Sequence, residues 1–224
     1  MKRLLLLSLV ALFGASLVRA EATRADLVDR VESCRAILEE FQRGPHAIPT
    51  EILKRAQAIV IVNQFKGAFL LGIRDGYGVI LVRKPNGGWS LPVLISAGEA
   101  SLGLQVGANS IETVYVITDA KPPRLLFKHR FNVGVDAKAV AGPKAAEAQK
   151  LNKEILETPV LVYQKSTGLY AGATVKAGHL SRNDAANFLL YNTRYTLPEL
   201  LYGDWVQPAQ EVQPLMALVQ KLTR

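Results

Sequence analysis

The chain has 224 residues, of which 49% are apolar and 21% charged, so its length and composition suit one domain with a sizeable core. Its single cysteine excludes an internal disulfide framework and any cysteine-based metal cluster. The formal net charge of +8 favours anionic partners, such as the head groups of phospholipids.

The first twenty residues have the pattern of a secretory signal peptide. Two basic residues precede an apolar run from residue 4 to 13, and Val18-Arg19-Ala20 resembles a cleavage site. The apolar run is shorter than the roughly 20 residues that span a bilayer. We therefore expect cleavage near Ala20 and a single mature domain over residues 21 to 224. The mature protein is expected to be periplasmic or secreted, where nucleic acid is not a partner.

The pattern of residues 24 to 42 predicts an amphipathic helix that ends at Gly44-Pro45, and a short helix follows from Thr50 to residue 57. The polar face of the first helix mixes acidic and basic residues, unlike the Lys- and Arg-rich face of a membrane-surface helix. We therefore expect it to pack on its own domain, with Cys34 buried and unreactive. The apolar residues that recur at spacings of four and three are Leu27, Val31, Cys34, Leu38 and Phe41.

Residues 58 to 180 predict a β core, because apolar and β-branched runs alternate there with glycines and turn residues. Asn86-Gly87-Gly88 is a hairpin signal. Long helices do not alternate with these runs, so we expect a mostly antiparallel sheet of about eight or nine strands, curled or barrel-like. The expected strands are AIVIVNQF, GAFLLGIR, YGVILVRK, WSLPVLISAG, TVYVITD, RLLFKHRFNVGVDAKAV, VLVYQKS and LYAGATVKA.

The last part of the chain, residues 181 to 224, is predicted to be helical in two pieces, at 184 to 191 and 208 to 222. Residues 137 to 157 are rich in alanine and lysine and predict a loop with a helical turn. Together with the helical residues 24 to 57, this gives an α+β fold in which N- and C-terminal helices flank a curled antiparallel sheet.

The glycine-rich run ISAGEASLGLQVG has none of the known phosphate or nucleophile motifs. No Gly-Lys-Ser/Thr follows it, and it lacks both the G-x-G-x-x-G and the G-x-S-x-G spacing. We interpret Gly98, Gly103 and Gly107 as positions at which a strand bends or approaches a neighbouring backbone closely.

The sequence does not indicate an enzyme. His46, His129 and His179 lie far apart, and none has a metal ligand two to four residues later. Acidic residues are few in the strand region, so a paired-carboxylate site is not favoured. We expect no catalytic residues, no cofactor and no metal ion, and a hydrolase with an unrecognised site is the third alternative for the function.

Basic residues on strands and turns are the most distinctive polar feature. One interpretation is scattered, solvated charge, and the other is a basic face that binds anionic lipid head groups. Trp89, Trp205, Phe69 and Tyr170 have two interpretations, insertion at an interface or packing in the core, and we expect core packing for each of them. The residues predicted to bind lipid are Lys66, Arg74, Arg83, Lys84, Lys128, Arg130, Lys165 and Lys176.

A series of motifs between residues 25 and 222 resembles the SYLF domain family. No single motif is specific, but the ordered set is. The motifs are Lys66-Gly67-Ala68-Phe69, Gly76-Tyr77-Gly78-Val79, Arg83, Asn86-Gly87-Gly88-Trp89-Ser90-Leu91-Pro92, Gly103-Leu104-Gln105-Val106-Gly107, Ala141-Gly142-Pro143, the run from Tyr163 to Gly172, and Arg182-Asn183-Asp184-Ala185-Ala186-Asn187 leading to Tyr191.

This resemblance implies lipid binding. In eukaryotes the SYLF domain is a phosphoinositide-binding, actin-associated module of endocytic proteins, and exported bacterial members are described as lipid-binding. We therefore expect peripheral binding of anionic phospholipid at the bacterial envelope, with the head group left open. Actin is not expected in a periplasm, and the family supplies no catalytic set. The alternative is an envelope scaffold that binds a protein partner or peptidoglycan.

Overall fold

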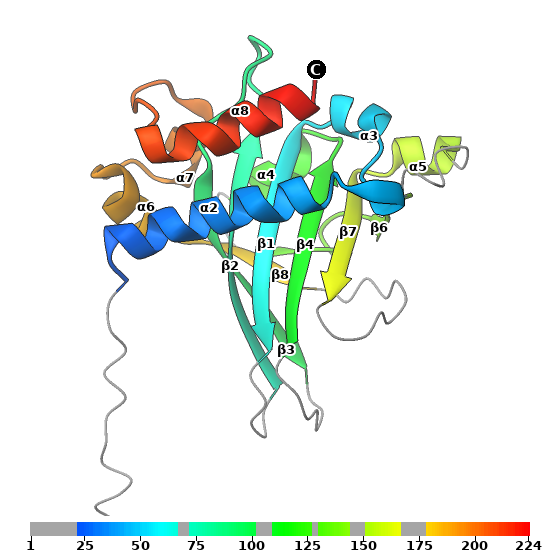
Figure 1. Cartoon of the computed structure of the whole chain (residues 1–224), viewed down its shortest axis with the longest axis horizontal. Helices are drawn as coiled ribbons and strands as arrows, with labels where there is room; N and C mark the ends of the chain where they lie inside the picture. The colour runs from blue at the N-terminus through cyan, green and yellow to red at the C-terminus, as the bar shows by residue number, and fades with distance from the viewer. Residues whose placement is uncertain (1–21, 67–71, 102–108, 127–129, 144–150, 167–177) are drawn as a thin grey trace, which may run out of the picture.

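The computed structural model describes residues 22–66, 72–101, 109–126, 130–143, 151–166 and 178–224. Its centre is an eight-stranded sheet with the strand order β5-β8-β3-β2-β1-β4-β7-β6. Helices from both ends of the chain pack on one face of the sheet, which curls so that β8 passes behind β1 and β2 (Figure 1). This arrangement confirms the predicted α+β fold class.

Four long strands form the middle of the sheet. β1 (Ala58–Lys66) pairs antiparallel with β2 (Gly72–Val82) on one side and with β4 (Asn109–Ile117) on the other. β3 (Val93–Ser101) extends the sheet beyond β2. The Asn86-Gly87-Gly88 turn joins β2 to β3, as predicted, and Gly87 adopts the positive φ of 80° that glycine tolerates.

Four shorter strands complete the sheet. β7 (Val160–Ser166) pairs with β4, and β8 (His179–Arg182) pairs with β3. β5 (Phe131–Asn132) and β6 (Ala139–Ala141) form the two edges. Among the described strands, only β6 and β7 pair in parallel, so the sheet is mostly antiparallel as expected.

The strand predictions are wrong at two places in the chain. GAFLLGIR and YGVILVRK do not form separate strands, because β2 begins at Gly72, near the end of the first segment, and continues into the second while paired with β1. Residues 67 to 71 of the first segment lie outside the described residues. The run from residue 124 to 140 is not one strand either. It begins in α4 (Lys121–Leu125), whose two prolines suit a helix start, and a turn with φ of 84° at Gly134 separates β5 from β6. The strand expected over LYAGATVKA lies outside the described residues.

The helices agree better with the sequence. α2 (Arg24–Glu40) and α3 (Thr50–Lys54) match the two predicted N-terminal helices, with a 3-10 turn (Gly44–His46) between them. α5 (Lys153–Glu157) is the predicted helical turn, and α6 (Asp184–Tyr191) has the predicted bounds. The last helix, α8 (Gln213–Leu222), follows a 3-10 turn (Gln210–Val212). The sequence prediction missed β8 and α7 (Leu197–Tyr202).

Helix α2 packs on the sheet, as its mixed charge pattern predicted. Thr23 and Asp26 form a capping box at its start, in which each side chain bonds the backbone N–H of the other. Leu27, Val31 and Leu38 are buried. Cys34 is buried too, and burial raises the pKa of its thiol to about 12, so the thiolate that would react is absent at neutral pH.

Both faces of the sheet are buried at its middle. Every residue of β1 from Ala58 to Gln64 is at most 8% exposed. Successive side chains of a strand point to opposite faces, so Ile59 and Ile61 face α2 while Val60 and Val62 face the inside of the curl. Because both faces exclude water, the sequence of β1 is a nearly continuous apolar run in which apolar and polar residues do not alternate.

Two glycines of β2 lie so close to the neighbouring strand that a side chain would not fit. A Cβ atom at Gly76 would lie 2.6 Å from the carbonyl oxygen of Asn63, and one at Gly78 would lie 2.4 Å from that of Ile61. Only glycine fits such positions. The predicted bend residues Gly103 and Gly107 lie outside the described residues, so that interpretation stays a prediction.

A buried amide fastens α6 to the sheet. The side chain of Asn187 is fully buried, and its Oδ1 accepts from the backbone N–H of Leu94 at 2.7 Å. Its Nδ2 donates to the carbonyl of Leu94 at 2.8 Å and to that of Asn183 at 2.9 Å. The amide therefore pairs both backbone groups of Leu94, as a neighbouring strand would.

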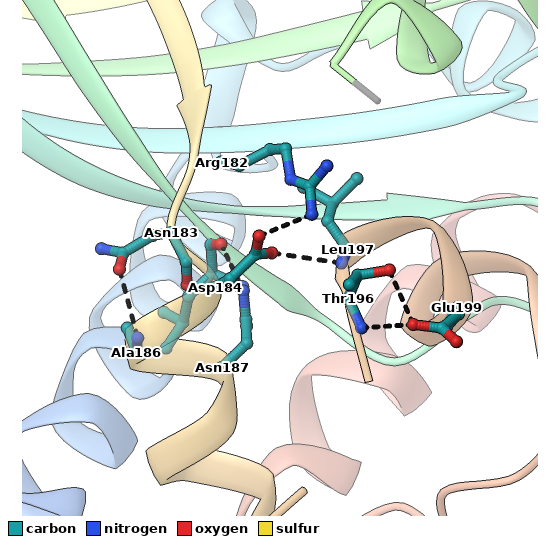
Figure 2. Close-up of polar contacts among 9 residues, drawn as sticks. Arg182, Asn183, Asp184, Ala186, Asn187, Thr196, Leu197 and Glu199 are labelled. Atoms are coloured by element: carbon teal, nitrogen blue, oxygen red, sulfur yellow. Dashed lines mark hydrogen bonds and ion pairs between the residues drawn. The ribbon is translucent and has the colours of Figure 1, made fainter. Parts of the chain in front are cut away.

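Polar contacts then join α6 to α7 (Figure 2). Asp184 forms an ion pair with Arg182 at 2.5 Å, and its Oδ1 accepts from the backbone N–H of Leu197 at 3.2 Å. Thr196 and Glu199 form a capping box at the start of α7. One carboxylate thus connects the end of β8 with the beginnings of two helices.

The end of α8 is held by Arg83 and Trp89. The indole Nε1 of Trp89 donates to Thr223 Oγ1 at 2.9 Å, and the Arg83 guanidinium lies 5.0 Å from the indole ring. Arg83 also donates to the carbonyl oxygens of Ala56 at 2.8 Å, Lys54 at 3.3 Å and Thr223 at 3.3 Å. One guanidinium therefore ties the ends of α3 and α8 to the sheet.

Replacing Asn187 by alanine is expected to lower the free energy of unfolding by about 3 kcal/mol, because it leaves two buried backbone groups without partners. Chemical denaturation measures the loss. The control is Asn152→Ala, which removes an exposed helix cap on α5 and should cost about 1 kcal/mol or less. Equal losses for the two variants would contradict the role assigned to Asn187.

Arg83→Met is expected to lower the free energy of unfolding by about 2 kcal/mol, because three carbonyl oxygens lose a charged donor. The matched variant is Lys84→Met, in which the lost ion pair has an exposed partner, Asp204, and should contribute less than about 1 kcal/mol. Thermal unfolding of both variants tests this. An Arg83 variant as stable as the Lys84 variant would disprove the anchoring role.

Candidate functional site

Basic residues gather at the end of the sheet where β1 begins and where β2 and β4 end. Ala58 pairs with both Val82 and Ile117, so these strand ends lie in one row. Figure 1 shows α3 and the C-terminus at the same end. We call this surface the basic end. Its members are Lys54, Arg55, Arg83, Lys84, Lys121, Arg124, Lys221 and Arg224.

The fold explains why cations meet here. Lys54, Arg124 and Lys221 each lie in the last turn of a helix, where a positive charge interacts favourably with the helix dipole. Six of the eight side chains are exposed, and Arg83 and Lys84 are half-buried. Burial lowers the pKa of Arg83 from its ordinary value, which is far above neutral pH, so the group stays charged.

Acidic residues at this end are fewer than the cations. Lys84 pairs with Asp204 and also donates to the carbonyl of Gly203 at 3.1 Å. Asp119 accepts a backbone N–H at the start of α4, and Glu51 lies in the first turn of α3. α5 adds one lysine and two glutamates to the same end. The described residues of the basic end therefore carry a net positive charge.

The predicted lipid-binding residues do not lie on one surface. Arg83 and Lys84 belong to the basic end and make contacts within the chain. Lys66 and Arg74 are direct partners across β1 and β2, but at the opposite end of those strands. Arg130 is exposed near His179, and burial together with this arginine lowers the pKa of the histidine. Lys128 and Lys176 lie outside the described residues.

Lys165 takes part in a separate polar row that crosses the sheet beside α2. The strand register places Tyr77, Asn63, Glu112 and Lys165 side by side on β2, β1, β4 and β7. Lys165 pairs with Glu40 of α2. Burial and the nearby Glu40 raise the pKa of Glu112, while Lys165 lowers it. The charges in this row largely neutralise one another.

The same row contains an incompletely bonded amide. Asn63 Nδ2 donates to the hydroxyl of Tyr77 at 3.3 Å, and that hydroxyl donates to Ser33 Oγ at 3.1 Å. Within the described part of the chain, no donor reaches Asn63 Oδ1, although the residue is only 8% exposed. The row has mixed charge and little exposed surface, so it is a poorer candidate for a large anionic partner.

The two tryptophans have different environments. Trp89 is 6% exposed and lies in the core, as predicted, whereas Trp205 is 64% exposed. The prediction of a core position is therefore wrong for Trp205, because the loop after α7 carries it outside the packed helices. Phe69 and Tyr170 lie outside the described residues.

The described residues contain no group of three His, Cys, Asp or Glu side chains placed to hold a metal ion. In the same part of the chain, none of the helices is long and apolar enough to cross a membrane. The expectations of no cofactor and no catalytic set remain predictions.

Six members of the basic end are absent from the predicted site: Lys54, Arg55, Lys121, Arg124, Lys221 and Arg224. A signal for four of them was present in the sequence. When two strands pair antiparallel, the residues before one strand lie at the same end of the sheet as the residues after its partner. Lys54 and Arg55 precede β1, and Lys121 and Arg124 follow β4. The position of α8 depends on tertiary packing and had no such signal.

Comparison with known proteins identifies relatives over most of the chain. A family model described as "Ysc84: Las17-binding protein actin regulator" matches residues 98–222. The "LAS seventeen-binding protein 3" of Saccharomyces cerevisiae (strain ATCC 204508 / S288c) is 30% identical over 176 residues, or 77% of this chain and 38% of that protein. The human "SH3 domain-containing YSC84-like protein 1" is 25% identical over 193 residues, or 83% of this chain and 56% of that protein.

The chain therefore spans between about a third and three fifths of the length of these relatives. Their names describe binding and regulatory proteins. The match of the family model over more than half of the chain agrees with the ordered motifs and with the α+β fold, and the chain belongs to the Ysc84 (SYLF) domain family.

Proposed function

We propose that the protein binds membranes peripherally and recognises anionic phospholipid through the basic end. The observation that supports this most directly is the convergence of eight cations from four separate segments on one end of the sheet. Anionic head groups are the ligand class that such a surface attracts.

The expected strength follows from the number of exposed charges. Each Lys or Arg near an anionic membrane surface contributes about 1 kcal/mol, so the six exposed members would supply at most about 6 kcal/mol, which the acidic residues at the same end reduce. That sum corresponds to reversible association. Arg83 and Lys84 support the surface from behind through their contacts with α3, α8 and the Gly203 loop.

The remaining predicted residues lie apart from the basic end, so in this proposal they do not make the main contacts with lipid. Lys66 and Arg74 form a smaller basic pair at the opposite end of β1 and β2, and Arg130 is an exposed cation in that half of the sheet. We further propose an envelope location, periplasmic or secreted, on the basis of the leader pattern in residues 1 to 20. In that compartment phospholipid is available and actin is not.

A protein partner is the second candidate, because the family description names Las17 binding and actin regulation. For an exported chain this corresponds to an envelope scaffold that binds another protein or peptidoglycan. The two candidates differ in one respect that can be measured: lipid recognition by charge requires anionic lipid and weakens with salt.

The double variant Lys54→Glu/Lys221→Glu is expected to weaken binding to phosphatidylglycerol-containing vesicles at least roughly tenfold, because two attractive charges become repulsive. Both side chains are exposed, so the melting temperature should fall only slightly, through the lost interactions with two helix dipoles, and the variant should stay folded at the temperature of the binding assay. Co-sedimentation with anionic and with pure phosphatidylcholine vesicles, at low and high salt, measures the effect.

Arg130→Glu is the matched control, since Arg130 is an exposed cation in the other half of the sheet and should leave binding nearly unchanged. Equal binding of the wild-type protein to neutral and anionic vesicles would rule out recognition by charge. A stronger effect of Arg130→Glu than of the double variant would move the site to the opposite end.

A further inference from the structure

Three exposed aromatic side chains lie next to the basic end. Trp205 is 64% exposed, Tyr202 is 39% exposed and Tyr195 is 36% exposed. We call these three residues the aromatic edge. They come from α7 and the loops on either side of it. A large apolar ring in water is unfavourable for folding, so an exposed cluster of them indicates a surface that contacts something else.

Trp205 is held in a defined position. Its ring lies 5.4 Å from the ring of Tyr195, with 32° between the ring planes. On another side it lies against Gly203, where a Cβ atom would be 2.6 Å from the indole Cε3. Lys84 fixes the same loop through the carbonyl of Gly203 and the carboxylate of Asp204.

The helix behind the aromatic edge is rigidly attached. Leu197, Leu200 and Leu201 of α7 are buried. Figure 2 shows the start of α7, where the backbone N–H of Leu197 donates to Asp184 and the Thr196–Glu199 capping box closes the first turn. The exposed rings are therefore presented by a fixed element, and binding would not have to order them first.

The aromatic edge is continuous with the basic end. The Arg124 guanidinium lies 5.5 Å from the centre of the Tyr202 ring. Lys84 contacts the residue that follows Tyr202, and exposed Arg194 precedes Tyr195 in the sequence. Cations and aromatic rings thus occupy one uninterrupted surface.

This combination matches the chemistry of a bilayer interface. Tryptophan and tyrosine rings are amphipathic and favour the head-group level of membranes, while nearby arginine and lysine side chains contact phosphates. We propose that the aromatic edge inserts into the head-group region of anionic membranes, with Trp205 as the deepest residue. This inference rests on the proposed function and adds the inserting element to it.

The charge of the neighbouring surface decides between a membrane and a protein partner. Exposed Trp, Tyr and Arg are also typical of protein interfaces. Here, however, the rings border a surface whose described residues carry a net positive charge. An extended anionic surface such as a membrane complements both the basic end and the aromatic edge. The rings would supply the apolar contact that the charges alone lack.

Intrinsic fluorescence tests the insertion, because the chain contains only two tryptophans and the other is buried. Addition of phosphatidylglycerol vesicles should shift the emission of the wild-type protein to shorter wavelengths, and lipids brominated near the head group should quench it. Trp205→Phe, which retains only Trp89, should show neither change.

Affinity gives a second measurement. Trp205→Ala should bind the same vesicles at least tenfold more weakly at an unchanged melting temperature. Val135→Ala is the matched control, because Val135 is 74% exposed in the turn after β5, away from this surface. The control should bind like the wild type.

The failures of the two proposals can be told apart. If the wild type sediments with anionic vesicles but its emission does not move and Trp205→Ala binds equally well, the aromatic edge does not insert, and lipid recognition by charge still stands. If the wild type does not sediment with any vesicle, both proposals are overturned. Burial of Trp205 by an envelope protein but not by vesicles would assign the surface to a protein partner.

Discussion

The antiparallel pairing of β1 with both β2 and β4 is the constraint on which the rest of the structure depends. It brings Ala58, Val82 and Ile117 into one row, so the segments that precede β1 and follow β2 and β4 must emerge at the same end of the sheet. α3, the Arg83–Lys84 pair and α4 are those segments. The basic end is thus a product of strand direction, and no local sequence cluster was needed to form it.

The basic residues of that end have two kinds of role. Arg83 is oriented inward, where it satisfies carbonyl oxygens at the ends of α3 and α8 and lies over Trp89. Lys84 likewise makes contacts within the chain, whereas the six other members of the basic end are exposed. A guanidinium suits the inward position because its five donors lie in a fixed plane and can bond several acceptors at once. The charge of Arg83 therefore stabilises the fold and is less accessible to a ligand than the exposed charges around it.

The fold class, the N-terminal helices, α6 and the hairpin were predictable because each depends on local chemistry: apolar spacing, caps and turn residues. The run from residue 124 to 140 was not, because its apolar residues are distributed among a helix, two short edge strands and a tight turn at Gly134. The candidate site was predicted only in part. Arg83 and Lys84 stood out as adjacent cations on a recognisable motif, whereas Lys221 and Trp205 acquire their positions from helix packing, which no short window of sequence encodes.

The direction of the long strands also determines how the molecule would stand on a bilayer. A strand of nine residues such as β1 is about 30 Å long, at roughly 3.3 Å per residue. With the basic end and the aromatic edge at the lipid surface, the strands β1 to β4 would stand roughly perpendicular to the membrane. The other ends of these strands would then be held about that distance above the head groups, beyond the Debye length of roughly 8 Å at physiological salt. The positions of Lys66 and Arg74 would lie at that height, beyond the electrostatic reach of the membrane below.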